Sequence, residues 1–170
     1  MSDIPVIPPY CPEDFSKLWV ADYNGKTILD IGADRGSTAS YFLRNGAKYV
    51  VCVEGDPERY RLLEANLPSL RNATAIFKYI NSPSDMQNIL WINSADIVKI
   101  DVEGAEKYLL PLAPYTIQYH PEYMIEMHLG VSMDAMVNLF QRSGYSVTYG
   151  ARSWLGDWQI IHCKRVQNYP

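Results

Sequence analysis

Gly32 and Gly36 follow directly after a short apolar run, and an acidic residue, Asp34, lies between them. Glycines permit a sharp turn and let another molecule approach the backbone closely. The next apolar run ends on a carboxylate, Glu54. At this point of a nucleotide-binding α/β unit, a carboxylate can accept hydrogen bonds from both hydroxyls of a ribose. The pattern therefore predicts a site for a ribose-bearing ligand.

The glycine spacing and the nearby charges restrict that ligand. The loop reads Gly-x-x-x-Gly and lacks the Gly-x-Gly-x-x-Gly spacing that is typical of a pyrophosphate site. Asp34 also adds negative charge where a diphosphate would lie, whereas Asp30 and Asp34 together would stabilise a positive charge. We therefore expect a ligand with an ammonium and a sulfonium group at its far end, and we do not expect a dinucleotide.

A second set of reactive side chains follows two later apolar runs. His128 ends the run from Glu122, and a histidine with an ordinary pKa near 6.5 can take a proton from a hydroxyl group. His128 is therefore the candidate general base, with a structural hydrogen-bonding role as the alternative. Asp101 and Glu103 are site candidates that would orient an acceptor, face the sulfur or hold the loop, and the sequence leaves their individual roles open.

Two other interpretations concern the same region: a divalent-metal site, and a purely structural role for Glu106. Asp101, Glu103, Glu126 and His128 together contain the oxygen and imidazole ligands that suit Mg²⁺ or Mn²⁺. A divalent metal is therefore an alternative, but it is not favoured, and no metal ligand is assigned. Glu106 lies in the first turn of an expected helix, where a favourable interaction with the helix dipole explains it without catalysis.

The elements that must position these residues follow a strand, helix, strand order. Thr27–Ile31 and Tyr49–Val53 are short apolar runs typical of buried parallel strands, and Ser37–Arg44 has one apolar helical face. This is a right-handed crossover unit of an α/β sheet. Later apolar runs predict further elements. These are strands over 73–80, 95–101 and 122–128, a helix from 133, and a closing antiparallel hairpin over 145–149 and 158–163.

Length and composition limit the protein's class. A chain of 170 residues is expected to form a single domain, with an N-terminal extension and short helix over 1–25 and a core over 26–165. The formal net charge of −4 gives no general attraction to nucleic acid. Cys11, Cys52 and Cys163 lack metal-ligand spacing and come in an odd number, which argues against a disulfide framework. With no run long enough to span a membrane, we expect a cytoplasmic protein.

Three stretches of the chain resemble a known family over roughly Lys26 to Lys164. They are Asp30-Ile31-Gly32-Ala33-x-x-Gly36, Val53-Glu54-Gly55-Asp56-Pro57 and Lys99-Ile100-Asp101-Val102-Glu103-Gly104-Ala105-Glu106. Together they are similar to class I S-adenosylmethionine-dependent methyltransferases, and the third stretch in particular is similar to the FkbM-type family. The resemblance implies an α/β, Rossmann-like doubly wound sheet in the order 3-2-1-4-5-7-6. This sheet would be mostly parallel, with an antiparallel strand from the C-terminal hairpin.

The resemblance also implies a cofactor and its binding residues. S-adenosylmethionine would bind, with S-adenosylhomocysteine as the product. In relatives, the loop after the third strand places polar groups near the adenine, where Ser82 or Asp85 could serve unless the loop is a plain turn. Gly55 stands where relatives often carry proline, which would loosen the adenine wall. The implied cofactor-binding residues are Asp30, Gly32, Ala33, Asp34, Gly36, Glu54, Gly55, Ser82 and Asp101.

The resemblance implies O-methylation of a hydroxyl on a sugar-containing or other small metabolite. The acceptor would then be a small molecule or a glycan, and we expect neither nucleic acid nor membrane as a partner. The chain is short for the FkbM-type family, which leaves three alternatives. A large acceptor such as a glycan or another polymer reaches an open crevice, a second subunit, as in a homodimer, completes the site, or the chain only binds the cofactor. The alternative function is a non-catalytic S-adenosylmethionine-binding or assembly protein that retains the fold.

Overall fold

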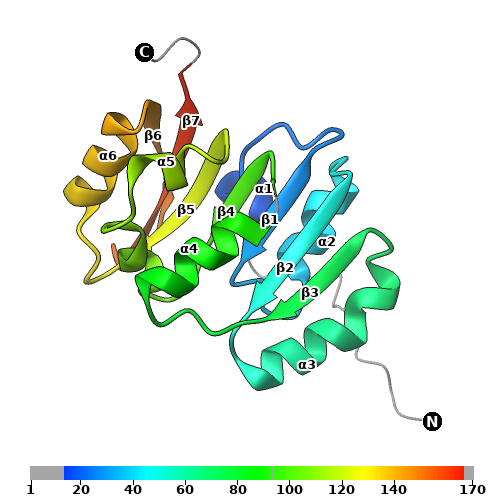
Figure 1. Ribbon diagram of the computed structural model, residues 1–170. Helices are drawn as coiled ribbons and strands as arrows, with labels where there is room; N and C mark the ends of the chain where they lie inside the picture. The colour runs from blue at the N-terminus through cyan, green and yellow to red at the C-terminus, as the bar shows by residue number, and fades with distance from the viewer. Residues whose placement is uncertain (1–13, 93, 167–170) are drawn as a thin grey trace. The chain divides into compact units, whose positions relative to one another are not determined.

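The computed structural model describes residues 14–92 and 94–166 (Figure 1). The prediction for Cys11, and that for the part of the N-terminal extension before residue 14, lie outside the described residues. Seven strands form a sheet in the order β3-β2-β1-β4-β5-β7-β6. The pairs β1–β2, β2–β3 and β4–β5 are parallel, whereas β7 pairs antiparallel with both β5 and β6. The predicted fold class and strand order are therefore confirmed.

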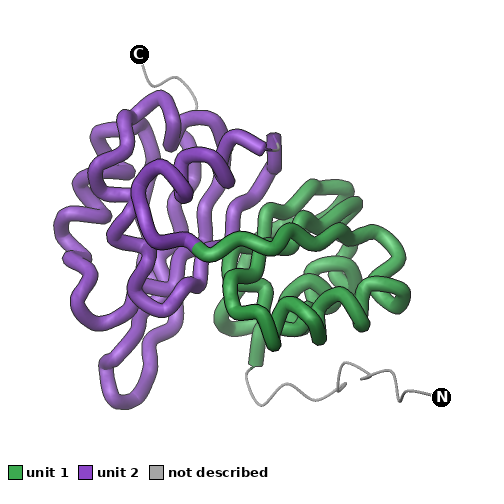
Figure 2. Tube along the Cα trace, turned by 60° about the horizontal axis from the view of Figure 1, so that its bottom comes forward, with its two compact units in different colours: residues 1–79 green, residues 80–170 purple. Residues whose placement is uncertain are grey.

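The chain divides into two compact units, residues 1–79 and residues 80–170 (Figure 2). Each is described by itself. No helix of the described residues could cross a bilayer, since the longest have 10 residues and would extend about 15 Å against an apolar bilayer core of about 30 Å.

The first unit is the strand, helix, strand crossover and the elements that follow it. Strands β1 and β2 align Thr27 with Tyr49 and Ile31 with Val53, and both are buried along nearly their whole length. Their continuous apolar runs suit a sheet that is covered on both faces. The elements of this unit are α1 (Phe15–Leu18), β1 (Thr27–Ile31), α2 (Ser37–Arg44), β2 (Tyr49–Glu54), α3 (Pro57–Asn66), the 3₁₀ helix η1 (Leu67–Ser69) and β3 (Ala73–Phe77).

The second unit contains a helix that the sequence patterns did not predict. Residues 81–85 were expected to form a loop, but helix α4 begins at Pro83, a residue whose fixed φ suits the first turn of a helix. The elements of this unit are α4 (Pro83–Ile92), β4 (Ile97–Ile100), the 3₁₀ helix η2 (Ala105–Leu109), α5 (Pro114–Ile117), β5 (Glu122–His128), α6 (Met133–Arg142), β6 (Tyr145–Arg152) and β7 (Trp158–Arg165).

Aromatic rings fill the core of the second unit around β5. Tyr123, Phe140 and Tyr145 pack edge to face, with ring centroids 5.0 to 5.9 Å apart. His120 is fully buried beside them and contacts the carbonyl oxygens of Leu90 at 2.7 Å and Ala95 at 3.0 Å. These contacts fix the start of β5, the strand that ends at His128.

Candidate functional site

The glycine loop of the first unit turns sharply between β1 and α2. Gly32 and Gly36 have φ values of 81° and 93°, and Asp34 between them has a φ of 48°. These are left-handed conformations, which cost glycine little and which other residues seldom adopt. The backbone N–H groups of Gly32 and Ala33 donate to the carbonyl of Val53, at 2.9 and 3.0 Å. The loop is therefore attached to the end of β2.

Glu54 makes a second attachment between this loop and β2. Its Oε2 accepts a hydrogen bond from the N–H of Asp34 at 2.8 Å, and its Oε1 accepts from the N–H groups of Gly55 and Asp56, each also at 2.8 Å. The predicted ribose-binding acid and the glycine loop thus lie side by side within one unit. Glu54 itself is buried, so its first role is to hold two turns together.

The remaining capacity of Glu54 limits how it could bind a ribose. A carboxylate offers about four lone-pair positions, two on each oxygen. The three backbone N–H groups use two positions on Oε1 and one on Oε2. One position on Oε2 stays available to a hydroxyl donor, so binding of a second ribose hydroxyl requires a shared hydrogen bond or a small shift of the loop.

The two aspartates near the loop differ in their surroundings. Asp30 is fully buried in β1, and its Oδ2 accepts a hydrogen bond of 2.5 Å from the hydroxyl of Thr38 in α2. Asp34 is partly exposed and pairs with the guanidinium nitrogens of Arg35 at 3.2 Å and Arg59 at 3.7 Å. Asp30 therefore anchors the start of α2. Of the two aspartates, only Asp34 is exposed enough for its carboxylate to contact a charged ligand.

Close packing requires a glycine at position 55, which the sequence did not indicate. A Cβ at this position would lie 2.8 Å from the Cα and 2.9 Å from the Cδ2 of Tyr79. Such distances are well inside van der Waals contact, so only glycine fits. Gly55 therefore does not loosen this region as expected, because Tyr79 packs directly against it. The Tyr79 side chain is largely exposed, and the sequence patterns gave no reason to single it out.

Ser82, in the second unit, caps helix α4. Its hydroxyl donates to Oδ2 of Asp85 at 2.7 Å and accepts from the backbone N–H of Asp85 at 3.1 Å. Oδ2 of Asp85 also accepts from the N–H of Asn81 at 3.3 Å. The Ser82 hydroxyl thus accepts an N–H at the start of the helix, as an N-cap residue does, and Asp85 accepts the N–H of Asn81 just before it. The cap accounts for both side chains, while cofactor binding by Ser82 stays a prediction.

Asp101 lies just after β4, between a lysine and a histidine. Its Oδ2 is 3.6 Å from Nζ of Lys99, a buried side chain, and its Oδ1 is 3.9 Å from Nε2 of His128. Glu103 follows at a φ of 52° and is 74% exposed, with its Oε2 at 3.7 Å from the same nitrogen. The structure thus brings all three predicted catalytic residues together in one unit.

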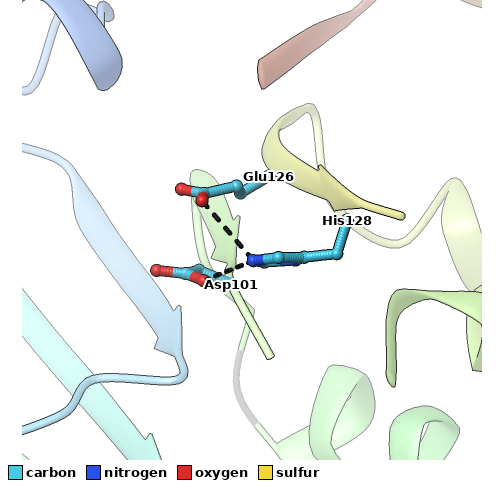
Figure 3. Close-up of side chains that lie close together, drawn as sticks. All are labelled: Asp101, Glu126 and His128. Carbon is cyan, nitrogen blue, oxygen red and sulfur yellow. Dashed lines mark ion pairs between the residues drawn. The ribbon is translucent and has the colours of Figure 1, made fainter. Parts of the chain in front are cut away.

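Glu126 completes the group around Nε2 of His128. It lies two residues earlier on β5, so both side chains point to the same face of the sheet. Its Oε1 is 3.5 Å from Nε2 (Figure 3). The Asp101–Glu126–His128 cluster offers one ligand atom from each residue, and these atoms all lie within 4.8 Å of one another.

Glu106 contacts the other nitrogen of the same ring. Its Oε1 is 3.0 Å from Nδ1 of His128 and also accepts the N–H of Val102 at 3.0 Å. Glu106 does lie in the first turn of a helix, η2, but its side chain is completely buried. Its predicted position in the first turn is confirmed, and the contact with His128 is a further interaction beside that with the helix dipole. No periodic pattern links positions 106 and 128, so the sequence carried no signal for this contact.

The carboxylates around His128 stabilise its protonated form. The pKa of His128 is raised from 6.5 to about 9, first by the hydrogen bond to Glu106 and further by the negative charges of Glu106, Asp101 and Glu126. Burial acts in the opposite direction because it disfavours a charged ring. At neutral pH the ring therefore carries a proton on each nitrogen, and Nε2 can accept a proton only after losing its own.

Comparisons with known proteins fix the fold. No protein-family model matches the chain. Precorrin-6y C5,15-methyltransferase of Geobacter metallireducens superposes with a TM-score of 0.64 at 16% identity, over 89% of this chain and 85% of that one. Aeropyrum pernix fibrillarin, in complex with natively bound S-adenosyl-L-methionine, gives 0.63 at 15% identity, over 85% and 68%. The fold is that of class I S-adenosylmethionine-dependent methyltransferases.

Two further similarities are to a solved structure and to a viral protein sequence. M. jannaschii TYW2, in complex with AdoMet, superposes with a TM-score of 0.58 at 17% identity, over 88% of this chain and 73% of that one. In sequence, the chain is 39% identical over 103 residues to uncharacterized protein 65 of Sulfolobus islandicus filamentous virus (isolate Iceland/Hveragerdi). That match covers 58% of this chain and 56% of the viral protein, so the chain matches only about half the length of this relative.

Proposed function

We propose that this protein is an S-adenosylmethionine-dependent methyltransferase. The observation that carries the proposal is the hydrogen bond from the N–H of Asp34 to Glu54, which joins the glycine loop to an acid at the end of β2. The fold shared with fibrillarin and TYW2, which bind S-adenosylmethionine, supports the same cofactor. The Lys99 to Glu106 stretch supports an FkbM-type methyltransferase within this class.

The first unit offers groups that fit the cofactor. Glu54 retains an acceptor position on Oε2 for a ribose hydroxyl. Asp34 is a partly exposed carboxylate that can meet the ammonium group. Tyr79 packs on Gly55 beside Glu54 and exposes its ring, so we assign it to the adenine. In this proposal Gly32, Ala33 and Gly36 shape the loop, and Asp30 anchors it. Cofactor binding by Ser82 and by Asp101 stays a prediction from the sequence.

The acceptor we propose is a hydroxyl, on a sugar-containing or another small metabolite or on a glycan. S-adenosylmethionine, when bound, supplies an activated methyl group on sulfur. A hydroxyl acceptor must lose its proton, and Nε2 of His128 can take it once the ring is neutral. Asp101 and Glu103, both within 4 Å of that nitrogen, would orient the acceptor. Because the pKa of His128 is about 9, methyl transfer by this route is expected to increase as pH rises toward that value.

Calorimetric titration with S-adenosylhomocysteine tests the cofactor part of the proposal. We expect binding to the wild-type protein and at least a tenfold loss of affinity in Glu54→Ala. Glu58→Ala is the matched control, because Glu58 is an exposed acid in the first turn of the next helix, α3. An absence of binding, or equal binding by the Glu54→Ala protein, would contradict the proposal.

A labelled-methyl assay tests catalysis separately. Wild-type protein is incubated with radiolabelled S-adenosylmethionine and extracts rich in glycans and small metabolites. We expect labelled products from the wild type and a strong loss of label with His128→Gln. If the protein binds the cofactor and transfers no methyl group, the non-catalytic alternative replaces the enzymatic one.

A further inference from the structure

We propose that Asp101, Glu126 and His128 bind a divalent transition-metal ion through Oδ1, Oε1 and Nε2. Side chains from the ends of two neighbouring parallel strands, β4 and β5, supply these atoms. The proposal stands apart from methyl transfer, because metal binding can be measured without cofactor or acceptor.

The imidazole of His128 is held in the orientation that a metal ligand requires. Glu106 is fully buried, and its Oε1 lies 3.0 Å from Nδ1 of His128. With the Nδ1–H donated to this carboxylate, the lone pair of a neutral ring lies on Nε2. Figure 3 shows Nε2 directed toward Asp101 and Glu126. Metal-ligating histidines commonly donate their other N–H to a carboxylate, which fixes the ring and strengthens the ligand.

The distances suit a small cation between the three side chains. Nε2 lies 3.9 Å from Oδ1 of Asp101 and 3.5 Å from Oε1 of Glu126. Metal–ligand bonds of about 2.1 Å require ligand atoms to lie about 3 to 4 Å apart in tetrahedral or octahedral geometry. All three atoms lie within 4.8 Å of one another, so metal binding requires the side chains to rotate somewhat closer together. Oε2 of Glu103, at 3.7 Å from Nε2 on an exposed side chain, could add a fourth ligand.

The charges of the group also call for a cation. Asp101, Glu103, Glu106 and Glu126 all lie within 4 Å of the His128 ring, and Nζ of Lys99 lies 3.6 Å from Oδ2 of Asp101. The four carboxylates outnumber the two positive charges of Lys99 and the protonated ring. The second oxygen of Glu106, Oε2, is buried without a hydrogen-bond partner among the described residues. A buried carboxylate that is incompletely paired destabilises the protein unless positive charge lies nearby. A divalent ion on Nε2 replaces the proton that this nitrogen carries at neutral pH and releases it to solvent, so binding adds one net positive charge next to this group.

The ligand set indicates which ion would bind. Two carboxylates with one imidazole suit Mn²⁺, Fe²⁺ or Zn²⁺ better than Ca²⁺, which takes oxygen ligands. Three protein ligands also leave coordination positions for water or a substrate oxygen. While the metal occupies Nε2, His128 cannot accept a proton, so the metal-loaded and metal-free forms differ in this property.

Titration of the metal-stripped full chain with Mn²⁺ tests the proposal. We expect His128→Ala, Asp101→Asn and Glu126→Gln each to lower Mn²⁺ affinity at least tenfold. The positioning residue Glu106 is tested by Glu106→Gln, for which we expect a loss of about 10- to 100-fold. The control is Glu122→Gln, at the opposite end of the same strand, where the carboxylate faces Lys164 at 4.0 Å. This control should keep wild-type affinity within about twofold.

Pulsed electron paramagnetic resonance provides a readout that does not depend on how well the variants fold. Mn²⁺ bound to the wild-type protein should show echo modulation from a directly coordinated imidazole nitrogen. This modulation should disappear when the histidines are labelled with ¹⁵N and be replaced by the ¹⁵N coupling. No Mn²⁺ binding, binding without a nitrogen signal, or unchanged affinity in His128→Ala would each overturn the metal proposal. None of these results would affect S-adenosylhomocysteine binding, which tests the proposed function.

Discussion

Glu106 and His128 are 22 residues apart in sequence, yet Oε1 of Glu106 lies 3.0 Å from Nδ1 of His128. The glutamate is completely buried, whereas the other edge of the histidine ring faces Asp101, Glu103 and Glu126. One nitrogen is thus engaged by the protein interior, and the other is available for chemistry. This division between the two nitrogens decides how the ring titrates.

The first prediction concerns the pKa of His128 in the metal-free protein. Removing the charge of Glu106 by Glu106→Gln weakens the largest cause of the shift, so the pKa should decrease from about 9 toward 6.5. Titration of the His128 ring followed by NMR in the presence of a chelator measures this change. Glu122→Gln is the control and should leave the pKa as in the wild type. A pKa of about 9 that persists in Glu106→Gln would contradict the assignment.

The second prediction follows from thermodynamic linkage. The folded-state pKa of His128 lies above its unfolded value, so the stability that protonation contributes is fully present below pH 6.5. It is lost as pH rises through about 9. The free energy of unfolding of the metal-free protein should therefore decrease between these pH values, and the decrease should be smaller in His128→Gln. Urea unfolding at several pH values measures it, and an identical slope in both proteins would contradict the linkage.

The third prediction concerns Glu54 as a structural residue. Glu54→Ala leaves the N–H groups of Asp34, Gly55 and Asp56 without their shared acceptor. Partly buried donors that lose a charged partner cost about 1–3 kcal/mol each when water does not replace it, so we expect a loss of about 2–4 kcal/mol in unfolding free energy. Chemical denaturation measures this loss, with Glu58→Ala again as control. A change below about 0.5 kcal/mol would show that Glu54 does not hold the loop.

The fourth prediction concerns the contact between Gly55 and Tyr79. In Gly55→Ala, the new methyl group would lie 2.8 Å from the Cα of Tyr79, and the backbone must shift to relieve the clash. We expect a destabilisation of about 1–3 kcal/mol by denaturant unfolding. Gly104→Ala is a useful comparison, because the space there is empty and only the left-handed backbone, with a φ of +97°, is strained. If Gly55→Ala is as stable as the wild type, this close contact does not require glycine.

The fifth prediction compares two buried threonines. Thr38→Val removes the hydroxyl that donates to the buried carboxylate of Asp30, so the free energy of unfolding should decrease by about 1–3 kcal/mol. Thr116 is also buried, but its hydroxyl has no hydrogen-bond partner among the described residues. Thr116→Val should therefore be neutral or stabilising. Equal losses in the two variants would contradict the importance of the Thr38–Asp30 bond.

Local patterns were enough for most of the elements. Three elements have the bounds that their apolar spacing predicts: Thr27–Ile31, Ser37–Arg44 and Glu122–His128. A helix with one buried face, or a strand that is buried throughout, requires apolar residues at regular positions along a short stretch of sequence, and this spacing can be read directly. Helix α4 was missed because its start, Ser82-Pro83, also reads as a turn. A turn and a helix start use the same residues here. Only the packing of the apolar residues after Pro83 decides between the two.

By itself the sequence determined which chemical groups are present and at which strand ends they lie: the glycine loop and Glu54, and later Asp101 and His128. Only the tertiary structure decided their partners. It buried Glu106 against His128, bound Glu54 to the N–H of Asp34, and set Tyr79 against Gly55. The physical reason is that these contacts join residues 20 or more positions apart, whose meeting depends on how whole strands and helices pack and leaves no periodic pattern in the chain.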